Sequence, residues 1–186
     1  MSHDIMIDLE TLATTADAAI LSIGAVHFDL DAGTVFDQTF YSACSIDSQP
    51  GRAISGSTLA WWMDQCKDAK DVFADPHMRE LEFVLAELDS FMGATPGIHP
   101  TVWSNGADFD LPMLTHAYKQ FGWTPPWKPY AGRCYRTYKN LPSAHAIKLE
   151  RTGQHHNALD DAIYQARHLC AIHQALFMTH EEGSLA

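Results

Sequence analysis

Apolar and polar positions alternate along the first predicted strand, residues 4–11, which read DIMIDLET. Side chains at alternate positions of a strand point to the same face. Asp8 and Glu10 therefore project together, while Ile7 and Leu9 face the other way. Two neighbouring carboxylates repel, and each raises the pKa of the other unless a cation lies between them. The pattern is typical of a site for a hard divalent metal ion, or of a solvated strand end that enters a turn.

The next segments predict an antiparallel meander. A largely apolar run covers residues 18–28, the turn-forming sequence DLDAG follows at 29–33, and residues 34–43 form a third predicted strand. Because one short connection joins the second and third strands, we expect them to pair in opposite directions.

Helical spacing follows the meander. Ser57 or Thr58 is placed to cap a helix through residues 61–63. From about His77 to Met92 the apolar residues fall on one helical face. The glycine and proline residues of 93–100 then break the pattern.

A strand-to-helix junction is predicted at the next element. Residues 101–104 form a short strand, which runs into the turn-prone Asn105 and its following glycine. Asp108 and Asp110 precede an apolar helical pattern that continues to Phe121. Either acid is placed to cap this helix or oppose its dipole, and either is equally placed for chemistry.

The last third of the chain contains a basic, aromatic loop and a long helix. Residues 122–142 are mostly loop, with a helix expected around 133–141. The final helix starts near His156 and runs to about Met178, so that Asp161 lies about one turn in. A second pair with the same spacing, His155 and Asp160, lies one residue earlier.

Composition indicates one globular domain over residues 1–186, with 46% apolar residues and five tryptophans. No apolar run is long enough for a membrane span, and the N-terminal residues lack the regions of a signal peptide. The cysteines are scattered without zinc-binding spacing, which fits free thiols in a reducing cytoplasm. They are Cys44, Cys66, Cys134 and Cys170.

The net charge of −11 argues against tight binding to a nucleic-acid duplex. Seven of the 12 basic residues nevertheless fall between positions 119 and 151, where the only acid is Glu150. These seven are Lys119, Lys128, Arg133, Arg136, Lys139, Lys148 and Arg151. Such a basic arc is either a solvated surface or a local positive potential suited to transient handling of a nucleic-acid end.

Three separated pieces together resemble the DEDDh-type, DnaQ-like 3′–5′ exonucleases. They are the D-x-E of Asp8 and Glu10, the NGADFD that ends at Asp110, and the H-x-A-x-x-D from His156 to Asp161. Their order and internal spacing match the three exonuclease motifs over nearly the whole chain. The surrounding sequences IDLETLATTADAAILSIGAVHFD and HNALDDA are most similar to exonuclease VIII-like phage proteins and RNase AS-type exoribonucleases.

The resemblance implies an α/β protein of RNase H-like fold, with a mixed central sheet flanked by helices, and a phosphodiesterase that uses two divalent cations, Mg²⁺ or Mn²⁺. Asp8, Glu10, Asp110 and Asp161 match the metal-binding carboxylates, and His156 matches the general base. The family pattern selects His156 and Asp161 over the neighbouring pair of equal spacing. Independently of the family, hydrolysis of a phosphodiester by two metal ions needs such anionic oxygen ligands and a base that titrates near neutrality.

Substrate contacts follow from the same resemblance. Thr11 and Leu12, directly after the first motif, are candidates to grip the 3′-terminal nucleotide, and Leu12 is as readily a core residue. Asn105 either orients the nucleotide or makes the turn. Arg133 and Arg136 are candidates to guide phosphates of the strand.

Three functions follow for comparison. The first is a 3′–5′ exonuclease on single-stranded DNA or RNA; the second is an RNA-specific 3′-end trimmer or oligoribonuclease, which would sense the 2′-hydroxyl. The third is a non-catalytic nucleic-acid-binding module of the same fold, which a carboxylate cluster disfavours because it destabilises a purely structural domain. The sequence leaves the oligomeric state undecided between a monomer and a homodimer. In a homodimer, Trp61 or Trp62 serves the interface as readily as it serves the core of a monomer.

Overall fold

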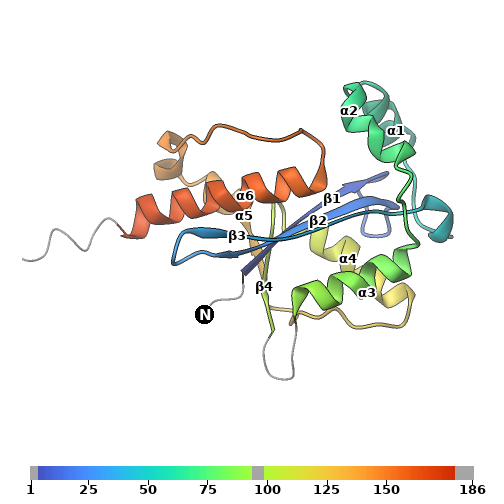
Figure 1. Cartoon of the computed structure of the whole chain (residues 1–186), viewed down its shortest axis with the longest axis horizontal. Helices are drawn as coiled ribbons and strands as arrows, with labels where there is room; N and C mark the ends of the chain where they lie inside the picture. The colour runs from blue at the N-terminus through green and yellow to red at the C-terminus, as the bar shows by residue number, and fades with distance from the viewer. Residues whose placement is uncertain (1–3, 94–98, 179–186) are drawn as a thin grey trace, which may run out of the picture.

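A five-stranded mixed sheet forms the centre of the protein, in the computed structural model that describes residues 4–93 and 99–178 (Figure 1). The strand order is β3-β2-β1-β4-β5. β1, β2 and β3 are antiparallel, so the predicted meander is confirmed, and β4 and β5 run parallel to β1 and β4 respectively. The strands are β1 (Asp4–Thr11), β2 (Ile20–Asp29), β3 (Thr34–Ala43), β4 (Thr101–Ser104) and β5 (Gly132–Cys134).

Helices cover both faces of this sheet. α6, with α5, packs on one face, and α3 and α4 pack on the other, while α1 and α2 lie together at one end (Figure 1). The helices are α1 (Gly56–Met63), α2 (Lys67–Lys70), α3 (Leu81–Met92), α4 (Asp110–Gln120), α5 (Tyr135–Lys139) and α6 (Ala158–His173). Shorter helical turns are η1 (Ile46–Ser48), η2 (Asp71–Ala74), η3 (Pro142–Ala146) and η4 (Gln174–Met178).

The alternation of β1 divides the core into two layers. Ile5, Ile7 and Leu9 are buried against α3 and α4, whereas Met6 is buried with α6 and α5. This arrangement follows from the two-residue period of a strand. It places the even-numbered residues of β1, including its acidic ones, under α6.

Two predicted helix starts are wrong. α1 begins at Gly56 after Ser55, not at Ser57 or Thr58. α3 begins at Leu81 rather than near His77. The cause is that Arg79 is held extended: its N–H donates to the carbonyl of Ala43 and its carbonyl accepts the N–H of Ser45. Tertiary pairing with the end of β3 therefore overrides the helical spacing of the side chains before residue 81.

The helix expected at 133–141 is shorter than predicted because a strand precedes it. β5 pairs with β4, with Val102 opposite Gly132, and α5 starts only at Tyr135. At Gly132 a Cβ atom would lie 2.9 Å from Leu111 Cδ1, so glycine lets this strand approach α4. A three-residue strand has no hydrophobic period to read, and its pairing is decided by β4.

The break predicted at 93–100 falls largely outside the described residues. Gly93 ends α3 in the left-handed conformation, with φ 61°. Across residues 4–93 and 99–178, no helix combines the length and apolar character that a membrane crossing requires.

Candidate active site

Asp8 and Glu10 lie on the face of β1 that α6 covers. Their neighbour Met6 is buried beneath α6, whereas Leu9 is buried on the opposite side of the sheet. Glu10 is only 7% exposed, and Asp8 is partly buried. The strand period thus directs both carboxylates toward α6 and away from bulk water.

Gly24 allows α6 to approach the sheet beside these carboxylates. Gly24 pairs with Asp8 across β1 and β2. A Cβ atom at Gly24 would lie 2.2 Å from the backbone C of Ala158 and 2.3 Å from the N of Leu159. A larger residue therefore does not fit unless the helix moves. This glycine sets the separation between the β1 carboxylates and the first turn of α6.

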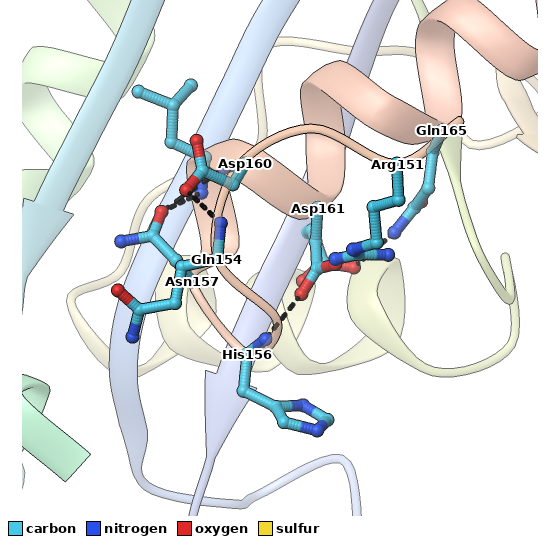
Figure 2. A network of polar contacts seen from close by, with 9 residues as sticks. Arg151, Gln154, His156, Asn157, Asp160, Asp161 and Gln165 are labelled. Atoms are coloured by element: carbon cyan, nitrogen blue, oxygen red, sulfur yellow. Dashed lines mark hydrogen bonds and ion pairs between the residues drawn. The ribbon is translucent and has the colours of Figure 1, made fainter. Parts of the chain in front are cut away.

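Side-chain hydrogen bonds fix the first turn of α6. Asn157 Oδ1 accepts the N–H groups of Leu159 and Asp160, each at 3.1 Å, and so caps the helix. Asp160 Oδ2 accepts the N–H of Gln154 at 2.7 Å and ties down the preceding loop (Figure 2). Gly153 makes this contact possible: its φ is 82°, and a Cβ there would lie 2.5 Å from Asp160 Cγ. Asp160 is thereby engaged in holding the loop.

Asp161 points to the other side of the helix, toward the cleft. Its Oδ2 accepts the backbone N–H of His156 at 3.0 Å, and its Oδ1 is ion-paired with Arg151 (Figure 2). One turn further along, Gln165 Nε2 donates to Asp8 Oδ1 at 2.7 Å. α6 therefore contributes one carboxylate to the cleft and an amide that orients another.

His156 joins this cluster through an unusual backbone conformation. It is the only non-glycine residue with positive φ, 62°, in the described part of the chain, a conformation that signals local strain. Its ring meets Trp61 edge-on at 4.8 Å and Trp62 at 6.2 Å between centroids. Ligand atoms of Glu10, His156 and Asp161 all lie within 4.8 Å of one another.

Asp110 approaches β1 from the opposite helix layer. It is the first residue of α4 and is 3% exposed. Its Oδ1 accepts the N–H of Leu9 at 3.3 Å. The two β1 carboxylates and Asp110 therefore approach one strand end from two sides, the first two from the face under α6 and the third from α4. Asp108, by contrast, is exposed and makes no capping bond to α4.

The electrostatics of these acids fit a cation site. Burial raises the pKa of Asp110 to about 7. Burial and the charge of Asp110 raise the pKa of Glu10 to about 8, and the same causes together with Glu10 raise the pKa of Asp8. Burial and the nearby His155 and Arg151 lower the pKa of His156. Carboxylates that resist ionisation together, beside a neutral imidazole, are a suitable donor set for a divalent metal ion.

Two adjoining cavities extend from this cluster. The first, about 310 Å³, is bounded by the acids and by Lys139 and Arg151. The second, about 400 Å³, is mostly apolar and shares Leu9 and Glu10 with the first. The first is lined by Asp8, Leu9, Glu10, Asn105, Tyr135, Lys139, Arg151, His155, His156, Asp161, Tyr164 and Gln165; the second by Leu9, Glu10, Thr11, Ala13, Thr14, Ser57, Thr58, Trp61, Trp62 and Phe109. A charged chamber and an apolar chamber therefore meet at Glu10.

Of the five predicted substrate residues, two line the cavities of the site and three do not. Thr11 lines the apolar cavity, and Asn105 lines the charged one, where its Oδ1 accepts a bond from Lys139 at 3.1 Å. Leu12 is 1% exposed and packs in the core, which is the second of its two predicted roles. Arg133 is exposed and donates to carbonyls of its own loop; neither it nor Arg136 is among the residues lining the charged cavity.

Sequence reasoning missed three residues that shape the site. From the sequence, Gly24 is only one position of a predicted strand, and Gln165 is only one position of a predicted helix. Trp61 is predicted to serve a core or an interface; it is 43% exposed, and its edge-on contact with the His156 ring is not apparent from the sequence. The one available signal was the glycine at the strand position opposite Asp8, a place where strands disfavour glycine unless another backbone approaches.

Comparison with known proteins gives a family match and a distant relative. The family described as the 3′-5′ exoribonuclease Rv2179c-like domain matches residues 3–173. An exodeoxyribonuclease of Enterobacteria phage T4 is 28% identical over 123 residues, which are 60% of this chain and 53% of that protein. The chain thus spans about half the length of this curated relative.

Solved structures share the fold at low sequence identity. The nuclease domain of 3′hExo, a DEDDh family member bound to rAMP, has a TM-score of 0.62 at 14% identity, covering 94% of this chain and 92% of that one. Exonuclease I has a TM-score of 0.66 at 13% identity, covering 94% and 41% respectively. The expected RNase H-like arrangement, a mixed sheet flanked by helices, is confirmed. On the match over residues 3–173, the chain belongs to the family of 3′-5′ exoribonuclease Rv2179c-like domains.

Proposed function

We propose that the chain is a metal-dependent 3′–5′ exonuclease that removes nucleotides from single-stranded 3′ ends. The observation that carries the proposal is the convergence of Glu10, His156 and Asp161 within 4.8 Å, from segments about 150 residues apart in sequence. Asp8 lines the cavity that these three residues share, and the carboxylate of Asp110 accepts a backbone N–H of β1 from the side of α4. A structural domain gains nothing from this burial of like charges.

The roles follow from the chemistry of each group. Asp8, Glu10, Asp110 and Asp161 would hold two divalent cations, Mg²⁺ or Mn²⁺. When bound, such ions supply an activated water and neutralise charge on the phosphate and leaving oxygen. His156 would accept the proton of the attacking water, because its lowered pKa favours the neutral imidazole.

The two cavities suggest how a nucleotide is held. Trp61 and Phe109 offer apolar surfaces suited to a terminal base, and Trp62 packs behind Trp61. Lys139 and Arg151 offer positive charge to the phosphates in the neighbouring cavity. RNA is the first substrate to test because the family is described as exoribonucleases. DNA is the second because the phage relative is named an exodeoxyribonuclease.

The test uses RNA and DNA of one sequence, each labelled at the 5′ end and incubated with Mg²⁺, Mn²⁺ or a chelator. We expect a ladder that shortens from the 3′ end, only with a metal ion. Asp110→Asn should abolish it, whereas Asp108→Asn, at an exposed position two residues away, should leave it. Internal cuts, or degradation that survives the chelator, would overturn the proposal.

Two further predictions concern the whole protein. A homodimer stays a prediction; light scattering during size-exclusion chromatography measures it. A cytoplasmic location also stays a prediction, and fractionation of cells that produce the protein checks it.

A further inference from the structure

Arg151 is the cation that faces the acidic cluster. It lies in the loop before α6, and its side chain is 21% exposed. The guanidinium pairs with Asp161 Oδ1 and stacks 4.9 Å from the centroid of the Tyr164 ring. Its charge also lowers the pKa of Asp8 and of Glu10, against the larger effect of burial. The positive charge of Arg151 thus offsets part of the repulsion among these carboxylates.

The guanidinium is held by few hydrogen bonds. Arg151 Nε is buried and has no hydrogen-bond partner among the described residues. The Nη2 atom, although it makes no conventional hydrogen bond, is engaged in the ion pair with Asp161. A buried donor left unpaired destabilises this arrangement, whereas a guanidinium can make up to five such bonds. The side chain is therefore anchored mainly by one carboxylate and one ring.

The geometry makes this contact and metal binding compete. Asp161 Oδ2 already accepts the N–H of His156, which leaves one lone pair on this oxygen and both lone pairs on Oδ1 for a cation. Arg151 is paired with Oδ1. A dication and a guanidinium on one oxygen atom would repel each other strongly in a partly buried site.

We propose that Arg151 is a displaceable internal cation, which a divalent metal ion replaces at Asp161. This rests on the proposed function, because it assumes that Asp161 binds a metal. Arg151 then holds the acidic cluster together before the metal binds, and it lowers the apparent metal affinity. The released guanidinium remains in the charged cavity beside Tyr164.

The test compares wild type with Arg151→Gln by thermal melting and by calorimetric titration with Mg²⁺. Lys139→Gln is the matched control: Lys139 lines the same cavity, but its ammonium donates to Asn105 instead of an acid. Without metal, Arg151→Gln should melt below wild type. At saturating Mg²⁺ the two should melt together, because the ion then occupies Asp161 in both proteins and the guanidinium of wild type no longer pairs with it. We expect Arg151→Gln to bind Mg²⁺ about tenfold more tightly, and Lys139→Gln less than about threefold.

Other outcomes separate the inference from the proposed function. If wild type shows no Mg²⁺ stabilisation, the proposed metal site fails and the inference fails with it. If wild type is stabilised but Arg151→Gln melts below it by the same amount with and without Mg²⁺, only the exchange is refuted. Equal changes in affinity for Arg151→Gln and Lys139→Gln would likewise refute it, since general charge removal would then explain both.

A measurement on wild type covers the case in which Arg151→Gln does not fold. The Nε–H resonance of Arg151, assigned as the one lost in Arg151→Lys, should shift in step with Mg²⁺ binding. A resonance that stays fixed while Mg²⁺ saturates the site would overturn the exchange.

Discussion

Gly24→Ala tests how the sheet and α6 bring the site together. The added methyl carbon would lie 2.2 Å from the backbone C of Ala158 and 2.3 Å from the N of Leu159. Carbon atoms in contact normally lie about 3.5–4.0 Å apart. Because both opposing atoms belong to the backbone, no side-chain rotation relieves the overlap. The first turn of α6 must therefore retreat from β2 by roughly 1 Å or more.

Both stability and activity should fall. Overpacking of a rigid core costs about 1–3 kcal/mol, and a backbone clash belongs at the upper end. A loss of about 3 kcal/mol lowers the Tm of a domain of this size by roughly 6–12 °C. The same shift carries Asp161 and His156 away from Glu10, and a misplacement of about 1 Å at a catalytic site can reduce the rate by about 10²-fold.

The assay is thermal melting with and without Mg²⁺, followed by the rate of 3′-end shortening measured well below the Tm of the variant. Gly56→Ala is the matched control, because a Cβ atom there meets nothing within 4 Å. Alanine at this first residue of α1 should be neutral or slightly stabilising. A Gly24→Ala protein that melts and cleaves like wild type would refute the claim that this close approach positions the site.

Three further predictions concern chemistry in the charged cavity. His156→Ala should keep the Mg²⁺-induced rise in Tm but lower kcat by about 10²-fold or more, measured by steady-state kinetics; an unchanged kcat would reject its role as the base. The pKa of Glu10 is raised from 4.5 to about 8 in the folded state. Without metal, protonation of Glu10 therefore stabilises the fold. This contribution is complete below pH 4.5 and is lost as the pH rises through about 8. Mg²⁺ competes with this proton, so scanning fluorimetry should show a larger Mg²⁺-induced rise in Tm near about pH 9 than near about pH 6; an equal rise at both would contradict the assignment. Lys139→Gln should raise KM and flatten its salt dependence by about one charge, whereas Arg133→Gln, outside the cavity, should do neither. Equal effects of the two substitutions would contradict the claim that substrate phosphates bind in the charged cavity.

Much of the fold could be predicted because its signals are local. The period of two along β1 determined which residues face each helix layer, and the turn at 29–33 implied the meander. The resemblance to DEDDh exonucleases, carried by three short motifs, likewise selects Asp8, Glu10, Asp110 and Asp161, whereas spacing alone leaves Asp108 and Asp160 as alternatives. Such signals survive in sequence because strand and helix periods link residue number directly to direction.

Features decided by tertiary contacts could not be read in this way. β5 is only three residues long and exists because β4 offers it a free edge. Leu12 lies two residues after the first motif, where the sequence leaves a nucleotide contact and a core position equally open, and only tertiary packing decides for the core. The pairing of Arg151 with Asp161 joins a loop to a helix, and no spacing rule predicts which member of a basic stretch reaches an acid.

Anomalous diffraction from crystals grown with Mn²⁺ and a mononucleotide tests the central claim most directly. The account predicts two manganese peaks, roughly 3.5–4 Å apart, bound by the carboxylates of Asp8, Glu10, Asp110 and Asp161, with the His156 ring beside them. Manganese bound elsewhere, or no peak among these four acids at a Mn²⁺ concentration that supports cleavage, would contradict it.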